Sequence, residues 1–315
     1  MKQDMRNVTF KQLRVLAAVV RTGSLTAAAQ RLNVSPPAVT LQMQLLQDQA
    51  GLPLVERSAA GTRPTDAGAE VLRAAEQIET ILADCSAALA SIAGTRRGTV
   101  SVGVTSTAKY FAPRALGAFA RAHPGIELRI VVGNRAEMIE GLQRYEIDIA
   151  VMGRPPDELD VDINVMGDHP HVVIAPPDHR LAQAASIAPA ELGAEVFLVR
   201  EPGSGTRGLM ERFFAEHGIT PRIGMQISSN ETIKQAVIAG LGIAFISGHT
   251  IDSALVTNSL AILPVQGLPI IRQWCIVHLR QRRMMPAVAA IRTFLMAEGG
   301  LYLPDISSSL RNKAP

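Results

Sequence analysis

Residues 22–47 contain two short capped helices joined by a tight turn, and they restrict the possible fold more than any other stretch of the sequence. Ser24 is a good N-cap for a helix over residues 25–32. Ser35 is placed to cap a second helix that begins at Pro36, where the missing N–H costs no hydrogen bond. The pattern predicts a helix-turn-helix, and an ordinary three-helix bundle is the alternative.

The second helix of this pair is apolar on one face only. Its apolar residues recur at helical spacing, at Val39, Met43, Leu46 and Ala50. The opposite face carries short side chains near the helix N-terminus, which suits insertion into the major groove of double-stranded DNA. The residues expected to contact DNA are Ser35, Pro36, Pro37, Thr40, Leu41, Gln44, Arg57 and Arg63.

Positive charge is concentrated in the N-terminal segment. Up to Arg63 there are eight basic and three acidic residues, whereas the whole chain has a net charge of only +3. The remainder is therefore slightly acidic, which is the distribution that binding to DNA phosphates through the N-terminal segment requires.

Residues 52–63 have the composition of a hairpin, with glycine, proline and arginine close together. Such a hairpin is expected to form a wing beside the helices and to hold Arg57 and Arg63 near the DNA backbone. A solvated loop is the alternative. Residues 1–64 are accordingly predicted to be a winged helix-turn-helix DNA-binding domain.

Residues 65–93 predict one long helix that pairs with a second copy of the chain. Its apolar positions alternate in steps of four and three, at Val71, Ala75, Ile78, Leu82, Cys85, Leu89 and Ile92. This heptad seam is flanked by charged residues and is typical of a coiled coil. All of these except Ala75 are taken as dimerisation residues, in a homodimer or homotetramer; packing on the rest of the same chain is the alternative. Residues 94–98 break the helix as a hinge.

From residue 99 onward, strands alternate with helices, which predicts a two-lobed α/β domain over 99–302. Lobe I is placed at about 99–168 and 269–302 with parallel strands, lobe II at about 169–268, and a tail at 303–315. Strands are expected at 100–105, 126–132, 147–152, 171–175, 196–200, 223–228, 243–247 and 270–279. Helices are expected at 113–122, 135–144, 206–217, 231–239 and 287–296.

Polar and basic residues gather where these strands end. Ligands of open α/β sheets bind beyond the carboxyl ends of the strands, and a glycine-rich helix start offers free N–H groups to an anion. The sequence therefore predicts a cleft for an anionic ligand, although solvated surface charge is the alternative for each basic residue. The predicted effector-binding residues are Thr105, Ser106, Thr107, Lys109, Asn134, Arg135, Arg154, Gly203, Ser204, Gly205, Thr206, Arg207 and Asn230.

Enzymatic and metal-dependent functions find little support in the sequence. Residues 203–208 satisfy GxGxxG, but no acidic residue follows about 20 positions later to bind a ribose. His169 and His171 lack further clustered ligands, so a structural role is expected for them rather than a metal site. We find no nucleophile motif and expect no catalytic residue and no resident cofactor.

Composition adds the expected location of the protein. No apolar run approaches the roughly 20 residues that a membrane span needs. With no signal peptide recognisable, a cytoplasmic protein is expected. A free solute-binding receptor would need such a signal and no basic N-terminal domain. Cys85 and Cys275 are interpreted as core thiols.

The segments SPPAVTLQMQLLQDQAGLPLVER and RPTDAG resemble the LysR-type transcriptional regulators, over nearly the whole chain. The resemblance implies a periplasmic-binding-protein-like (type 2) effector domain after the linker helix. Within the family, STAKYFAPRALGAFARAHPGIELRIVVGNR, MGRPPDELD, VVIAPPDH and REPGSGTRGLMERFF are similar to activators of Calvin-cycle (RuBisCO) operons.

This resemblance implies where the family's functions fall in the chain. Base reading falls on Pro36, Pro37, Thr40 and Leu41, and the apolar Leu41 favours thymine-methyl contacts and DNA shape over hydrogen-bond readout. The effector cleft falls on 105–107, Asn134, 203–207 and the helix start after Ser228. Ribulose bisphosphate, phosphoenolpyruvate or NADPH is implied as the effector, with promoter DNA and RNA polymerase as partners. The effector, the operator and the choice between activation and repression stay open.

Overall fold

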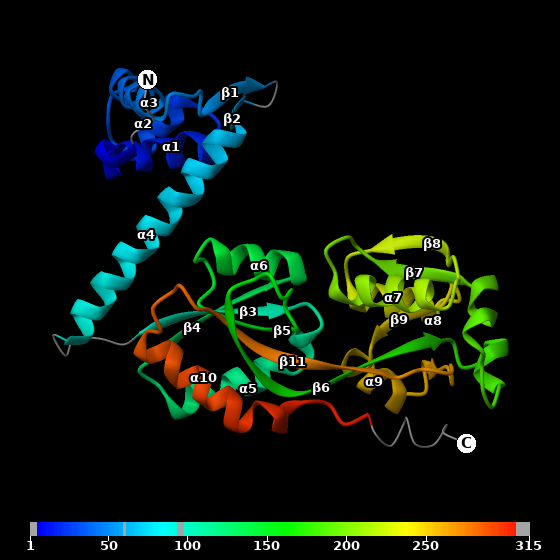
Figure 1. Ribbon diagram of the computed structural model, residues 1–315. Helices are drawn as coiled ribbons and strands as arrows, with labels where there is room; N and C mark the ends of the chain where they lie inside the picture. Colours follow the sequence, from blue (N-terminus) through cyan, green and yellow to red (C-terminus); the bar gives the residue numbers. More distant parts are fainter. Residues whose placement is uncertain (1–4, 59–60, 93–97, 307–315) are drawn as a thin grey trace. The chain divides into compact units, whose positions relative to one another are not determined.

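The chain is divided into two units, Met1–Ile92 and Ala93–Pro315. The computed structural model describes residues 5–58, 61–92 and 98–306 (Figure 1). The predicted hinge at 94–98 lies, except for residue 98, outside the described residues, as do 307–315 of the predicted tail. Within the described part, no helix is both long enough and apolar enough to cross a membrane.

The N-terminal unit begins with three α-helices. They follow the short 3-10 turn Met5–Asn7 and are α1 (Phe10–Thr22), α2 (Leu25–Leu32) and α3 (Pro36–Ala50). Ser24 caps α2 by accepting a hydrogen bond from the N–H of Ala27, as predicted. Ser35 occupies the N-cap position of α3 but makes no capping hydrogen bond. The predicted helix-turn-helix is confirmed, and α2 ends at Asn33 in the left-handed conformation.

A two-stranded hairpin follows, and it confirms the predicted wing. Strands β1 (Val55–Ser58) and β2 (Gly61–Pro64) pair antiparallel, with Glu56 opposite Arg63. The core beneath consists of fully buried apolar side chains from all three helices and the segment before β1: Leu16, Val19, Ala28, Val39, Leu46 and Leu54.

Helix α4 (Asp66–Ile92) extends this unit, and Thr65 caps it by accepting from the N–H of Gly68 at 3.0 Å. Its first turns belong to the core of the unit: Ala75 is buried and Val71 packs on the same cluster. Val71 is thus half-buried against its own domain, and its pairing with a second chain stays a prediction.

The later turns of α4 expose their apolar side chains. Leu82 and Leu89 are 48% and 62% exposed, and Ile78 and Ile81 are exposed too. Cys85 is also exposed, which corrects its interpretation as a core thiol, whereas Cys275 is buried as predicted. The side chain of Ile92 lies outside the described residues.

The second unit has the expected alternation of strands and helices. Its first part comprises β3 (Thr99–Thr105), α5 (Ala112–Ala122), β4 (Glu127–Gly133), α6 (Arg135–Gln143), β5 (Ile149–Gly153) and β6 (Val161–Ala175). The middle part comprises β7 (Val196–Arg200), α7 (Gly205–Glu216), β8 (Arg222–Ile227), α8 (Asn230–Ile238), β9 (Ala244–Ser247), α9 (Asp252–Val256) and β10 (Ala261–Ile262). The chain then continues through β11 (Ile270–Leu279) and α10 (Pro286–Glu298).

Two long strands join the lobes. Strands β6 and β11 pair antiparallel along ten residues of each, and both run from one lobe into the other (Figure 1). The expected parallel sheet of lobe I is thus only its β4–β3–β5 part, since β11 pairs antiparallel with β5. Residues 161–170 of β6 were not predicted as a strand.

Each lobe has its own core. In lobe I, Val102, Phe119, Trp274 and Ile291 are buried between the sheet and helices α5 and α10. In lobe II, Phe197, Phe214 and Phe245 are buried under α7. The two cores are separate, and the lobes are joined by β6 and β11, by contacts across the cleft and by contacts of His249 with Phe111 and Trp274.

Candidate nucleic-acid interface and ligand cleft

Helix α3 buries one face and exposes the other. Val39, Met43, Leu46 and Ala50 are buried. The predicted DNA-contacting residues of α3 are all exposed: Ser35, Pro36, Pro37, Thr40, Leu41 and Gln44. The Thr40 hydroxyl donates to the carbonyl oxygen of Pro36 at 3.1 Å, so its methyl group and its oxygen lone pairs remain accessible.

The two arginines of the wing differ in their partners. Arg63 pairs with Glu56, with 2.8 Å between Nη2 and Oε1. In the described part of the N-terminal unit, no carboxylate pairs with Arg57, which lies on β1 and is exposed. The full positive charge of Arg57 is therefore available to an external anion, whereas that of Arg63 is partly neutralised.

A cleft of about 640 Å³ lies between the two lobes. Most of the predicted effector-binding residues line it: Thr105, Ser106, Thr107, Asn134, Arg135, Arg154, Gly203, Ser204, Gly205, Thr206 and Arg207. They come from the ends of β3, β4, β5 and β7 and from the starts of α6 and α7. These residues are far apart in the sequence, and the rule that ligands bind beyond the carboxyl ends of the strands identified them correctly as neighbours.

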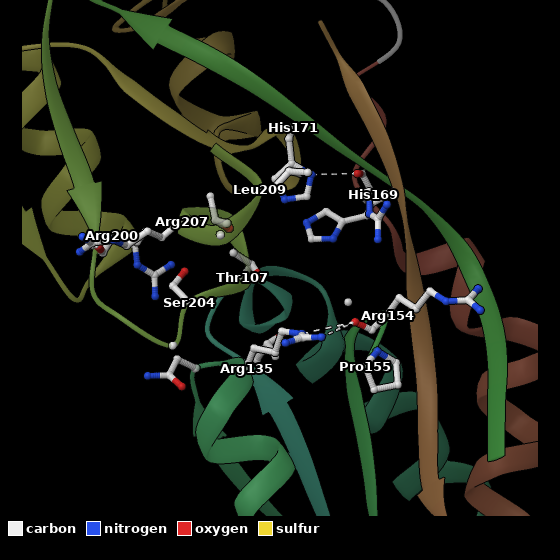
Figure 2. Close-up of a pocket in the computed structure, with 18 of the residues that line it drawn as sticks. Thr107, Arg135, Arg154, Pro155, His169, His171, Arg200, Ser204, Arg207 and Leu209 are labelled. Carbon is white, nitrogen blue, oxygen red and sulfur yellow. Dashed lines mark hydrogen bonds between the residues drawn. The ribbon is translucent and has the colours of Figure 1, made fainter. Parts of the chain in front are cut away.

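Two of the predicted contacts need correction. Lys109 does not line the cleft, and its ammonium group lies 5.4 Å from the ring of Tyr110. Asn230 is buried behind the residues that line the cleft, and its Nδ2 donates to the carbonyl oxygen of Ser106. Arg154 contributes its carbonyl oxygen, which accepts from Arg135, while its side chain leads away from Arg135 (Figure 2).

The start of α7 offers unused hydrogen-bond donors. Ser204 occupies the N-cap position without making a capping hydrogen bond, so its side chain leaves the first N–H groups of the helix available as donors. Three hydroxyl groups lie around this helix start, those of Thr107, Ser204 and Thr206. Within the part of the chain that the structure describes, none of them forms a hydrogen bond with a protein group. All three side chains are buried and line the cleft. A helix N-terminus with free donors from both lobes suits an anion.

Arg207 is held by its own lobe. Its Nε donates to Glu211 at 2.8 Å, and its Nη1 donates to Gln226 at 2.7 Å and to the carbonyl oxygen of Arg200 at 3.1 Å. The helix start that Arg207 belongs to faces the cleft, but its guanidinium charge is already paired.

Arg200 is a cleft residue that the sequence analysis missed. Its side chain is only 2% exposed and donates to both carboxylate oxygens of Glu201 at 2.8 Å, to Asn230 and to the Ser106 hydroxyl at 2.9 Å. It thereby ties lobe II to lobe I. The sequence signal that could have identified Arg200 is its position as the last residue of an otherwise apolar strand.

Gly203 is a point of close approach between the lobes. Its carbonyl oxygen accepts from the N–H of Ala136 at 3.3 Å. Its φ of +83° favours glycine, and a Cβ at this position would lie 3.1 Å from the Cβ of Ala136. Only a residue without a side chain lets the two helix starts meet in this way.

The crossing strands contribute two histidines, His169 and His171, which the sequence analysis expected to be structural. His169 stacks on Trp274 with 3.7 Å between ring centroids, and its Nε2 lies 2.9 Å from the Ser247 hydroxyl. Burial lowers the pKa of His171 to about 3 and holds the pKa of His169 well below its usual value, so both rings are neutral near pH 7. Among the described residues, no group of histidine, cysteine or acidic side chains is arranged to hold a metal.

Comparison with known proteins gives consistent matches for both units. Residues 10–69 match the family "Bacterial regulatory helix-turn-helix protein, lysR family", and residues 93–300 match "LysR substrate binding domain". The "HTH-type transcriptional regulator CbbR" of Xanthobacter flavus is 50% identical over 300 residues, which cover 95% of this chain and 90% of that protein. The "RuBisCO operon transcriptional regulator" of Allochromatium vinosum is 44% identical over 292 residues, 93% of this chain and 97% of that protein.

Solved structures include relatives of the second unit. One of them is the regulatory domain of CcmR from Synechocystis PCC6803 in complex with 2-PG, with a TM-score of 0.62 and 37% identity. The match covers 64% of this chain and 97% of that one.

Proposed function

Because the chain belongs to the LysR family of transcriptional regulators, we propose that it controls carbon-fixation genes in response to a phosphorylated metabolite bound between its lobes. Family membership confirms the predicted fold class and the expectation of a DNA-binding regulator rather than an enzyme. The role in carbon fixation is supported by the relative named as a RuBisCO operon regulator.

The DNA contacts that we propose follow from exposure and charge. The exposed face of α3 enters the major groove, and the wing follows the phosphate backbone. A homodimer or homotetramer places several such domains on one promoter, and RNA polymerase is the further partner of an activator. Thr40 and Leu41 read bases, while Arg57 and Arg63 contribute mainly sequence-independent attraction.

We expect Arg57→Ala to lower the salt dependence of promoter binding more than Arg63→Ala does. Each phosphate contact that is lost reduces the slope of log K against log salt by about 0.9 per subunit. Arg63 already shares its charge with Glu56, so its removal has the smaller effect. Fluorescence anisotropy at several salt concentrations measures both slopes. Equal slopes in the two variants would contradict this assignment.

For the effector, the observation that carries the proposal is the uncapped start of α7 with three buried hydroxyl groups that form no hydrogen bond with any described residue. A phosphate group fits such donors because the helix dipole and the N–H groups favour negative charge. The structure of CcmR with 2-PG supports a small phosphorylated ligand, since its regulatory domain is 37% identical to this chain. The candidates are ribulose bisphosphate, phosphoenolpyruvate, 2-phosphoglycolate and NADPH.

Calorimetric titration of the full chain with these four compounds tests the proposal. We expect at least one to bind, and we expect Thr107→Ala and Ser204→Ala each to weaken binding by about tenfold or more, since a hydrogen bond to a charged group contributes about 1.5–3 kcal/mol. Promoter footprints without effector should be unchanged.

Ser253→Ala is the matched control, because Ser253 is an exposed serine in α9 away from the cleft lining. If Thr107→Ala and Ser204→Ala bind each active metabolite as tightly as the wild type does, the phosphate is not held at the start of α7.

A further inference from the structure

The cleft contains a second concentration of positive charge away from the α7 start. Arg135 comes from α6, Arg212 from α7 and Arg272 from β11, and all three line the cleft. Within the described residues, the side chains of Arg212 and Arg272 have no hydrogen-bonding or ion-pair partner. Arg135 donates only to the uncharged carbonyl oxygen of Arg154. Glu158 therefore offsets part of the charge of Arg135, whereas no ion pair within the described residues compensates the charges of Arg212 and Arg272.

The guanidinium group of Arg135 is close enough to Arg212 and Arg272 to be repelled by both. The pKa of Arg135 is lowered, first by burial and then by the charges of Arg212 and Arg272. Like charges gathered from two lobes and a crossing strand raise the free energy of the empty cleft. An acidic group placed among them relieves this repulsion, and guanidinium groups bind carboxylate or phosphate through paired hydrogen bonds.

His169 adds an unused polar atom on the same side. It is 5% exposed and lies opposite Arg272 on the neighbouring strand, and its Nδ1 has no hydrogen-bond partner within the described part. Figure 2 shows its ring directed from the crossing strand towards Thr107 and Leu209, into the cleft. When Nε2 accepts from the Ser247 hydroxyl, Nδ1 carries the hydrogen and donates to a ligand.

The cleft thus has two separate sets of donors. The helix subsite consists of the first N–H groups of α7 with Thr107, Ser204 and Thr206. The arginine subsite consists of Arg135, Arg212, Arg272 and His169. We propose that the effector is a small molecule with an acidic group at each end, a phosphate in the helix subsite and a carboxylate or second phosphate in the arginine subsite. This inference rests on the proposed function of the cleft.

Matched pairs of ligands test the inference on the full chain. Ribulose 1,5-bisphosphate is compared with ribulose 5-phosphate, and 2-phosphoglycolate with ethyl phosphate, by calorimetry at one ionic strength. Only the first compound of each pair has the second acidic group. In at least one pair we expect it to bind about tenfold more tightly or better, because a charge-assisted hydrogen bond adds about 1.5–3 kcal/mol.

Substitution of the arginine subsite is expected to remove this preference selectively. Arg272→Gln should bring the ratio of the two affinities towards one and leave the weaker ligand of the pair within about twofold of its wild-type affinity. Arg212→Gln, at an exposed position of α7, is a second variant with the same expectation. Arg283→Gln is the control, since Arg283 is exposed and outside the cleft lining.

The outcomes separate the two proposals. If both members of each pair bind equally to the wild type, or if Arg272→Gln and Arg212→Gln weaken both members alike, the arginine subsite is wrong and the phosphate site stands. If no phosphorylated compound binds, the proposed function of the cleft fails as well.

Discussion

Replacing Leu82 by aspartate is expected to convert the proposed homodimer into monomers. Leu82 lies in the middle of α4 and is 48% exposed, in line with the exposed Ile78 and Leu89. In a two-fold coiled coil each substitution acts twice, and burying a carboxylate in an apolar seam costs about 2–5 kcal/mol per copy. We therefore expect the dissociation constant to rise by roughly a thousandfold or more. Light scattering over a concentration series measures it.

Ala83→Asp is the matched control, because Ala83 is exposed next to the seam and tests aspartate in the same turn of the helix. It should keep the wild-type mass. Promoter affinity should fall with Leu82→Asp, since a single domain contacts one half-site only. A Leu82→Asp protein with wild-type mass and wild-type promoter affinity would show that the exposed seam is not the dimer interface.

The second large effect, a fall in the free energy of unfolding, is expected for Arg282→Met in lobe I. Arg282 is buried, pairs with Asp148 and donates from Nη1 to the carbonyl oxygens of Tyr145 and Ile147 at 2.9 and 3.1 Å. Asp148 also accepts from the N–H of Ser101 at 2.6 Å, so the pair joins β3 to the turn after β11. Removing one partner of a buried pair costs about 3–5 kcal/mol, because a charge stays buried without compensation.

Arg280→Met is the control for this loss. Arg280 pairs with Asp160 and Asp162, but its side chain is 62% exposed, and exposed pairs contribute about 1 kcal/mol or less. Trp274 is the single tryptophan of the chain and is buried in the core of lobe I, so its fluorescence follows unfolding in urea. Free energies of unfolding that differ by less than 1 kcal/mol between the two variants would contradict the assigned role of Arg282.

Local sequence signals were sufficient for features that neighbouring residues form by themselves. The capped start of α2 at Ser24 and the bounds of β11 were predicted from neighbouring residues alone. Eleven of the thirteen predicted effector-binding residues line the cleft, because the ends of parallel strands meet at one edge whatever the loops between them do. The glycine-rich start of α7 was recognisable for the same reason, since its chemistry lies in consecutive residues.

Signals that depend on a partner in space were ambiguous in the sequence. The apolar seam of α4 has one period along its length, yet Val71 packs on its own domain and Leu82 does not. Periodicity specifies which side of a helix is apolar, but not which surface covers it. Likewise, nothing in the sequence near Asn230 indicates that its side chain forms hydrogen bonds with Arg200 and Ser106 rather than with the ligand.

The sequence by itself determined the helix-turn-helix, the exposed face of α3, the order of the elements in both lobes and an anion-binding helix start. These properties follow from hydrogen bonding and apolar periodicity within short stretches. Only the tertiary structure placed His169 and Arg272 side by side on crossing strands, and brought Arg135 and Arg212 to the same cleft from opposite lobes. Such juxtapositions depend on strand pairing between distant segments, and local propensity carries no information about the register of that pairing.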